Sequence, residues 1–433
     1  MCVCLPGAER CFRTVPFVPE PAFGPVTSFV QVPVRMRVLL INDVAKYLNG
    51  GANRVVVETL EGLHRRGMAV GCVYQSFSSE LSPEIWTRKV PHGLSATDLR
   101  TQILAAIADF RPDVIQCHTS QIISTYPHWV PDHACCQFVH DESWYCSGGN
   151  RVSRSLVHCQ RPHSGACLAW HVLEGCGGRS PRGNILRWRQ VQERTVLRRF
   201  AHLRVQVASA FMARGLVENG YPTDRLDVIP LYAAAPAITD TPTEPGLIVL
   251  PSRLVYHKGV HVLIAALAQL RALPWRLVVP GDGPEKLALQ EQARRLGVAE
   301  RVELPGELHP DLVATWYARA QIVAFPVLRE EPFGLVGTEA LAHGKPIVAF
   351  AGGAVDEWLW PGETGLKVAA KTPTALAAAL RELLIDPARC AAMGAAARRR
   401  YSDFTQAAFL DRLLLSLERT RSGRISGGGG EGE

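Results

Sequence analysis

The segment IVAFPVLREEPFGLVGTEALAHGKPIVAF spans residues 322–350 and decides how the second half of this 433-residue chain folds. Two apolar runs, Ile322–Pro326 and Pro346–Phe350, enclose a glycine-containing loop and a helical pattern. Short buried runs that alternate with helices are typical of βαβ units in a parallel sheet. Such sheets bind ligands beyond the carboxyl ends of their strands, so the residues after Pro326 are expected to face a ligand cleft.

The same alternation recurs along the whole chain. Its apolar runs lie at 36–42, 69–74, 113–117, 135–139, 203–208 and 227–230, and then at 247–251, 275–280, 302–304, 322–326 and 346–350. A chain of this length fits two domains of about 150 to 200 residues each. We therefore predict an α/β fold of two Rossmann-like, doubly wound parallel-sheet domains that face each other across a cleft.

Composition shifts set the predicted boundaries. The sequence divides into an N-terminal extension at 1–35, an N-terminal domain at 36–235, a linker at 236–246, a C-terminal domain at 247–400, a C-terminal helix at 401–421 expected to pack back on the N-terminal domain, and a flexible tail at 422–433. Met36 directly precedes the first strand and is a candidate start of translation.

Composition indicates a globular protein, with 47% apolar and 20% charged residues. No window approaches 18 consecutive apolar residues, and residues 1–35 lack the order of a secretory signal. The 12 cysteines are scattered, which favours reduced thiols and a cytoplasmic location, with peripheral association on the inner membrane face as a further possibility. The net charge of +7 suits anionic partners and does not choose among them.

Two carboxylates, Glu331 and Glu339, stand eight residues apart at the junction between strand and helix. Pro332 fits the first helical turn, and backbone N–H groups near Gly334 and Leu335 can receive phosphate at the helix start. One carboxylate can hold sugar hydroxyls and the other ribose hydroxyls. The plainer interpretation is a pair of solvated acids near a helix N-terminus.

Two cations favour the ligand-binding interpretation. Arg253 and Lys258 follow the apolar run at 247–251 and open a helix, where they can neutralise a pyrophosphate leaving group. Gly281 and Gly283 punctuate a turn after another strand, so that a nucleotide can approach the backbone without a side-chain clash.

Four segments together resemble the family 4 glycosyltransferases, also called the group 1 glycosyltransferases. They are RLVYHKG at 253–259, PGDGP at 280–284, EEPFGLVGTEALAHGKPIVA at 330–349 and AGGAVDEWLWPGETGLKV at 351–368. The resemblance extends over residues 36–415 and implies the two-domain GT-B fold. It departs from the family's commonest spacing at Glu357, which stands one residue later after Gly353.

The resemblance also implies an activity: transfer of a sugar, with retention, from a nucleoside diphosphate sugar to a hydroxyl of a glycan, lipid-linked or small acceptor. Arg253 and Lys258 would neutralise the diphosphate, Glu331 would contact the transferred sugar, and Glu339 would bind the ribose. The family needs no divalent metal, and the sequence has no Asp-x-Asp cluster for Mg²⁺. We therefore expect no cofactor and no metal at the site.

In the first half, Gly50 and Gly51 form a loop before a helix, and two glycines there are more often simple turn chemistry. His140 ends the run at 135–139, where a structural His–Asp pair with Asp141 is the plainer interpretation. By the resemblance, the glycines lie over the donor diphosphate and His140 lies near the transferred sugar. His118 is expected to be structural.

Two further features lie outside that pattern. Four cysteines with interleaved histidines suggest zinc, but they lack a Cys-x2-Cys pair, so a cysteine-containing acceptor loop is the favoured interpretation: Cys146, Cys159, Cys167 and Cys176. Residues 179–204 hold eight arginines and one acid on a helical pattern, with an irregular apolar stripe of Ile185, Trp188, Val191, Val196 and Phe200. This helix either lies on an anionic membrane or is an amphipathic helix with a solvated basic face; without stacking aromatics, nucleic acid is not expected.

Other functions are compatible with the fold. A GT-B epimerase is one alternative, and a phosphorylase would need a pyridoxal phosphate lysine. A catalytically silent subunit that binds sugar nucleotides is the alternative outside enzymes. The intact set of Arg253, Lys258, Glu331 and Glu339 favours an active transferase.

Overall fold

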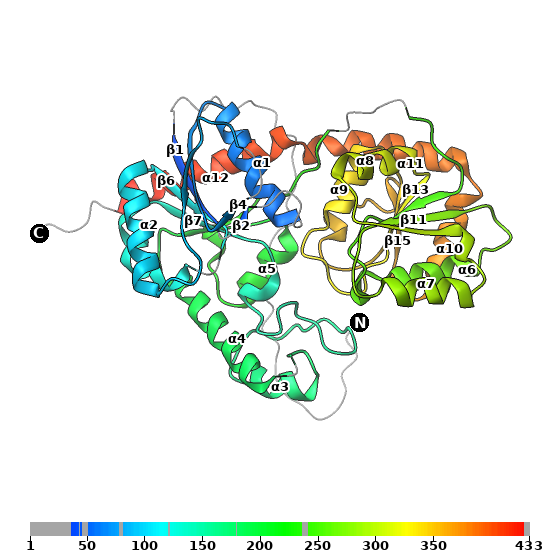
Figure 1. The fold of residues 1–433 in the computed structure, drawn as a ribbon, viewed down its shortest axis with the longest axis horizontal. Helices are drawn as coiled ribbons and strands as arrows, with labels where there is room; N and C mark the ends of the chain where they lie inside the picture. Colours follow the sequence, from blue (N-terminus) through cyan, green and yellow to red (C-terminus); the bar gives the residue numbers. More distant parts are fainter. Residues whose placement is uncertain are drawn as a thin grey trace, which may run out of the picture.

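A computed structural model of the chain describes residues 36–427, apart from 43, 46–50, 78–80, 120–121, 179 and 236–240. The described residues form two α/β domains side by side (Figure 1), each built on a parallel sheet. The predicted fold class is therefore confirmed. The N-terminal extension, Gly50 and the first part of the linker lie outside the described residues.

The N-terminal sheet has the strand order β5-β3-β1-β6-β7-β8-β9, and its neighbouring strands are parallel. Val38 of the interior strand β1 aligns with Val70 on one side and Val114 on the other. Strands β6 and β7 are buried at every residue, as expected for a sheet covered on both faces. Its strands are β1 (Arg37–Ile41), β3 (Ala69–Tyr74), β5 (Trp86–Lys89), β6 (Val114–Cys117), β7 (Cys135–Val139), β8 (Arg204–Val207) and β9 (Leu226–Val228), and β2 (Val44–Ala45) pairs separately with β4 (Ser76–Phe77).

The helices of this half surround the sheet and form a lobe that projects from it (Figure 1). They are α1 (Gly51–Arg65), α2 (Ala96–Phe110), η1 (Ile123–His128), η2 (Val130–Asp132), η3 (Glu142–Trp144), α3 (Cys167–Leu173), α4 (Pro181–Arg194), η4 (Thr195–Arg199), α5 (Ala210–Glu218) and η5 (Thr223–Arg225), where η marks a 3₁₀ helix. Helices α3 and α4 make up the projecting lobe.

The C-terminal sheet has the order β12-β11-β10-β13-β14-β15 and is parallel throughout. Its strands are β10 (Leu247–Val249), β11 (Arg276–Pro280), β12 (Val302–Gly306), β13 (Ile322–Phe325), β14 (Ile347–Phe350) and β15 (Gly365–Val368). Its helices are η6 (Tyr256–Lys258), α6 (Val260–Ala268), α7 (Lys286–Arg295), η7 (Ala299–Arg301), α8 (Pro310–Arg319), α9 (Leu335–Ala342), η8 (Val355–Glu357), α10 (Pro373–Leu384) and α11 (Pro387–Arg400). Local sequence explains their starts: Thr372 and Asp386 accept N-cap hydrogen bonds, each directly before a proline at the first helical position.

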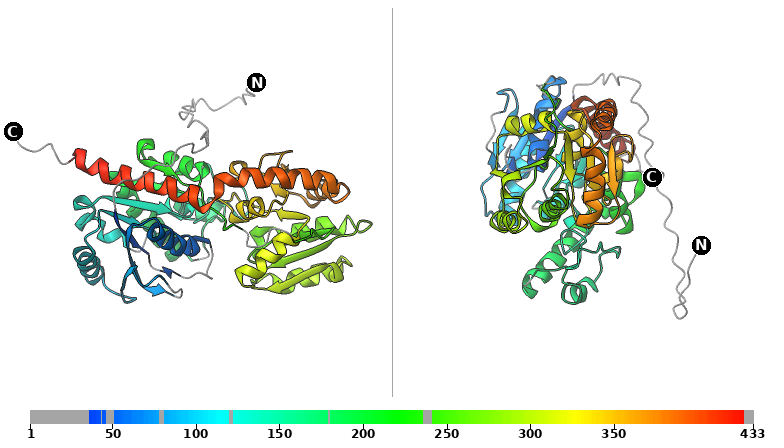
Figure 2. Two further views of the ribbon diagram at one scale, coloured as in Figure 1. Left: turned by 90° about the horizontal axis from the view of Figure 1, so that it is seen from above. Right: turned by 90° about the vertical axis from the view of Figure 1, so that its right-hand side faces the viewer.

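The last helix, α12 (Gln406–Gly427), follows η9 (Tyr401–Phe404) and runs back along the N-terminal domain (Figure 2). Its side chains Phe409, Leu413 and Leu417 are fully buried. Its Ser416 hydroxyl donates to Asp227 of β9 at 2.7 Å. The helix continues to Gly427, past Ser422, where the sequence predicted a flexible tail.

Burial along α12 predicts a sharp difference between two leucines of one helix. Leu413→Ala should lower the free energy of unfolding by about 2–5 kcal/mol, because Leu413 is 0% exposed in a packed core. Leu415→Ala should change it by less than about 0.5 kcal/mol, because Leu415 is 39% exposed. Urea unfolding of both variants checks this, and equal losses would contradict the packing of α12.

Candidate functional site

The loop after β13 carries Glu331 and leads into α9. The helix begins at Leu335 with Gly334 as its N-cap, at φ 89°, a left-handed conformation that glycine adopts at low cost. Pro332 therefore lies before the helix, and the prediction that it occupies the first turn is wrong. The wide, glycine-ended loop displaces the helix start, so only residues 335–339 of the interval between the two glutamates are helical.

Lys258 and Glu331 form an ion pair at the carboxyl edge of the sheet. Lys258 Nζ donates to Glu331 Oε2 at 3.0 Å, and the two side chains are 18% and 13% exposed. In a partly buried pair of this kind, each charge compensates the other. Removal of one partner is destabilising, because it leaves the other charge without compensation. The structure thus brings together two residues that stand 73 positions apart in sequence.

Gly259 makes this pairing possible. It has φ 73°, and a Cβ there would lie 1.9 Å from the carbonyl oxygen of Pro326. The backbone after η6 therefore packs directly on the end of β13. This close approach places Lys258 against the loop that carries Glu331.

Arg253 lies exposed in the loop between β10 and η6. The neighbouring His257 is surrounded by cations: burial lowers its pKa to about 4, with contributions from Arg329, Lys258 and Arg253, against the opposing charge of Glu331. The imidazole is thus neutral at physiological pH. Arg329 belongs to this positive region, and only its position beside the Glu330-Glu331 pair could have suggested it from sequence.

Gly281 and Gly283 bring a second loop against the one that carries Arg253. A Cβ on Gly281 would lie 2.0 Å from the Ser252 carbonyl oxygen, and one on Gly283 would lie 2.3 Å from that of Leu254. Backbone hydrogen bonds join the two loops, from Ser252 N to Pro280 O at 2.9 Å and from Leu254 N to Asp282 O at 2.8 Å. The close approach that these glycines permit is therefore between two backbone segments of the protein itself.

Glu339 takes a different partner from Glu331. The hydroxyl of Tyr317, a buried residue of α8, donates to Glu339 Oε2 at 2.7 Å. Tyr317 also stacks on His343, with ring centroids 5.3 Å apart. Sequence reasoning missed Tyr317, because nothing links it to Glu339 before α8 and α9 are placed beside each other.

Comparisons with known proteins follow the same division into halves. The family model described as Glycosyltransferase Family 4 matches residues 49–231, and the model described as Glycosyl transferases group 1 matches residues 233–400. Glycogen synthase of Mycobacterium tuberculosis is 30% identical over 330 residues, which cover 74% of this chain and 72% of the relative. The chain belongs to glycosyltransferase family 4.

Other likenesses agree with this family. D-inositol 3-phosphate glycosyltransferase of Kineococcus radiotolerans is 30% identical over 395 residues, covering 82% of this chain and 87% of the relative. The solved structure of Alr3699/HepE from Anabaena in complex with UDP matches with a TM-score of 0.66 at 19% identity, covering 88% of this chain and 100% of that chain. The last likeness shows the fold, which is GT-B. The enzyme is a glycosyltransferase.

His140 of the glycosyltransferase follows β7 and pairs with a second histidine. His118 Nδ1 and His140 Nε2 lie 3.0 Å apart, and the two rings stack with Phe138. Burial, together with the charge of His140, lowers the pKa of His118 well below its ordinary value. A neutral, buried His118 therefore orients His140, while Asp141 caps η3 by accepting from Ser143 N at 2.9 Å.

The remaining predicted donor residues lie at the starts of two helices. Gly51 is the first residue of α1, whereas Gly50 lies outside the described residues. Gly334 and Leu335 stand at the start of α9, where Gly337 N donates to Gly334 O at 3.0 Å and the N–H groups of Leu335 and Val336 have no carbonyl partner within the helix. These roles in binding stay predictions.

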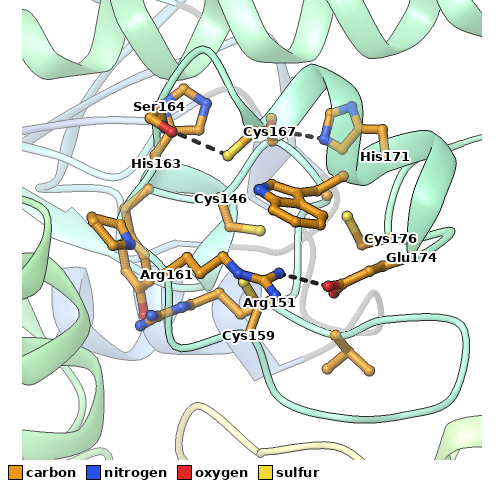
Figure 3. A pocket seen from close by; sticks show the side chains of 16 residues that line it. Cys146, Arg151, Cys159, Arg161, His163, Ser164, Cys167, His171, Glu174 and Cys176 are labelled. Atoms are coloured by element: carbon orange, nitrogen blue, oxygen red, sulfur yellow. Dashed lines mark hydrogen bonds and ion pairs between the residues drawn. The ribbon is translucent and has the colours of Figure 1, made fainter. Parts of the chain in front are cut away.

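Four cysteines of the projecting lobe line one cavity of about 50 Å³ (Figure 3): Cys146, Cys159, Cys167 and Cys176. All four are free thiols. Throughout the part of the chain that the structure describes, no group of three or more His, Cys, Asp or Glu side chains is placed to hold a metal ion. The cavity wall also includes Arg161, which forms an ion pair with Glu174 at 2.8 Å.

Helix α4 differs from the predicted stripe at its N-terminal end. Val191 is buried as expected, but Ile185 is 43% exposed, together with Leu186 beside it. The buried residues of α4 are Asn184 and Val191, and the core residue Leu197 belongs to η4, which follows α4. Among the described residues, no helix is long and apolar enough to cross a membrane.

The site geometry predicts that two glycines of similar conformation differ in what they tolerate. Gly297 has φ 64° with no atom within 4 Å of the position that a Cβ would take, so Gly297→Ala should cost only about 1–2 kcal/mol of conformational strain. Gly259→Ala adds a clash with Pro326 and should lower the free energy of unfolding by clearly more. Chemical denaturation of both variants measures the difference, and equal losses would argue against the close approach at Gly259.

Proposed function

We propose that this glycosyltransferase moves a sugar from a nucleoside diphosphate sugar to an acceptor hydroxyl, with retention of anomeric configuration and without a divalent metal in the chemical step. The observation that carries the proposal is the partly buried pair of Lys258 and Glu331, 3.0 Å apart beside Arg253 and the start of α9. The likeness to a fold solved with UDP supports the choice of donor.

The charge that develops on the leaving diphosphate needs compensation. Lys258 and Arg253 supply two cations, and the N-terminus of α9 supplies the N–H groups of Leu335 and Val336 and the positive end of a helix dipole. Fixed charges of this kind stabilise a transition state without reorganisation. In other transferases, carboxylates hold a Mg²⁺ ion that neutralises the diphosphate. Here the two cations and the helix N-terminus supply that positive charge.

The two glutamates then position the donor. Glu331, held by Lys258, accepts hydrogen bonds from hydroxyls of the transferred sugar, and Glu339, held by Tyr317, accepts from the ribose. His140 approaches the sugar from the N-terminal domain, with its ring fixed by His118. Because Glu331 is engaged with a cation, it suits positioning better than nucleophilic attack, which favours entry of the acceptor on the leaving-group face.

In this proposal the acceptor binds to the N-terminal domain, at the surface of the projecting lobe. Val172, Leu173 and Leu186 are 80%, 72% and 59% exposed, and Arg182 and Arg189 lie exposed on the same lobe. Apolar side chains flanked by arginines are the pattern of a segment that rests on an anionic membrane surface. We infer a peripheral membrane position and a lipid-linked or glycan acceptor presented there.

Loss of the cation or its partner should stop transfer. Lys258→Ala and Glu331→Gln should each lower kcat/KM by about 10²–10³-fold or more, because each removes charge or positioning that acts in the transition state. Glu307→Gln, at an exposed position, is the matched control and should keep wild-type turnover. Initial rates with the nucleotide sugar found in a donor screen measure this.

Wild-type activity should also be unchanged when Mg²⁺ is added, and strict dependence on Mg²⁺ would refute the metal-free step.

Membrane binding is tested by flotation with liposomes that contain phosphatidylglycerol. The wild type should float with anionic vesicles and much less with neutral ones, because arginines provide part of the attraction. The double variant Leu173→Asp and Leu186→Asp should remain in the bottom fraction. Leu287→Asp, which changes a 78% exposed leucine of α7, is the control and should float like the wild type. Equal flotation of all three proteins would contradict a role for the lobe.

A further inference from the structure

A carboxylate of the C-terminal domain binds the first turn of a helix in the N-terminal domain. Glu357, the last residue of η8, accepts a hydrogen bond from Ala210 N through Oε2 and from Phe211 N through Oε1, both at 2.9 Å. Ala210 and Phe211 are the first two residues of α5. These two bonds cross directly between the domains, over 147 and 146 positions of sequence.

The residue before α5 adds a third bond between the domains. The hydroxyl of Ser209 caps α5 by accepting from Met212 N at 3.1 Å, and it donates to the carbonyl oxygen of Pro332 at 2.5 Å. Pro332 directly follows Glu331. The N-terminal domain therefore holds the loop of Glu331 at its backbone as well as through Glu357.

The chemistry of a helix start explains why a carboxylate serves here. The first N–H groups of α5 have no carbonyl partner within the helix, and the helix dipole favours a negative charge at this end. Two N–H groups and the charge of Arg214 act against the burial that raises the pKa of Glu357, while Asp356 adds to the rise. A mostly buried carboxylate is thus kept in place by donors from the opposite domain.

The segment that carries Glu357 also shapes the loop of Glu331. Ala354 N donates to Glu331 O at 2.9 Å, and Gly353, at φ 65°, lies so close that a Cβ would be 2.3 Å from Glu331 N. The indole of Trp358, which is fully buried, donates to Phe333 O at 2.6 Å. Residues 331–333 are therefore bound on one side by residues 353–358 and on the other by Ser209.

We propose that Glu357 is a positioning residue that fixes the N-terminal domain against the donor loop. Its contact with α5 couples the relative placement of the two domains to the placement of Glu331 in the site. The inference rests on the proposed function, since it assigns Glu357 a part in sugar transfer. It also gives a structural role to the glutamate whose spacing departs from the family pattern.

The test compares Glu357→Ala and Glu357→Gln with Asp356→Asn in the full chain. Asp356 is the matched control, because its carboxylate is exposed and pairs with Lys367 at 2.6 Å instead of reaching α5. Glu357→Ala should lower kcat by at least tenfold and leave the affinity for the nucleoside diphosphate, UDP or GDP, within about threefold, because the loops of Arg253 and Lys258 are intact. Glu357→Gln, which keeps one acceptor oxygen, should fall between Glu357→Ala and the wild type. Asp356→Asn should keep wild-type kcat.

Two further measurements need no turnover. In Glu357→Ala, the amides at the start of α5 should exchange hydrogen faster, and small-angle scattering should give a larger radius of gyration, with little change in Tm. Wild-type exchange and scattering, or wild-type kcat, would overturn the proposal. So would a parallel loss of Tm and nucleotide affinity, which would mark a purely structural role. If the wild type transfers no sugar with any donor, the proposed function fails, and exchange and scattering alone decide whether the contact holds the domains.

Discussion

The ion pair between Lys258 and Glu331 is the interaction on which the candidate site depends. It joins two loops at the carboxyl edge of the C-terminal sheet, and it forms only because Gly259 lets the backbone pack against the end of β13. The pair is shielded enough that each charge depends on the other. A carboxylate beside cations can face a sugar without repelling the diphosphate attached to it.

The loop of Glu331 also links the chemistry to the arrangement of the domains. Its backbone is bound by residues 353–358 from its own domain and by Ser209 from the other. The return of α12 over the N-terminal domain ties the two halves together a second time, through buried apolar side chains and the hydrogen bond from Ser416 to Asp227. The loop of Glu331 is part of the C-terminal domain and is also hydrogen-bonded to the N-terminal domain. The two domains of this family 4 glycosyltransferase are thus in contact at the loop that carries the candidate site.

The apolar runs predicted most of the sheet strands well, because a strand that is buried on both faces consists almost entirely of apolar residues. The edge strands β5, with sequence WTRK, and β15, with sequence GLKV, were missed because they are short and half-exposed. Glu331, Lys258 and Arg253 could be chosen from sequence because each follows a strand end. Their pairing could not, and neither could the contacts of Tyr317 or Glu357, since these join positions that only the tertiary fold brings together. Ile185 shows the same limit: periodicity predicts an apolar stripe, but the lobe decides which part of it is covered.

We propose that the protein itself, through cations and a helix start, holds the donor diphosphate. A crystal structure of the enzyme with a bound nucleoside diphosphate, grown with Mg²⁺ present, tests it most directly. The diphosphate should contact Lys258, Arg253 and the backbone N–H groups near Leu335, with the ribose at Glu339 and no metal bridge. Phosphates held by Mg²⁺ on carboxylates, or bound away from Lys258 and the start of α9, would contradict the claim.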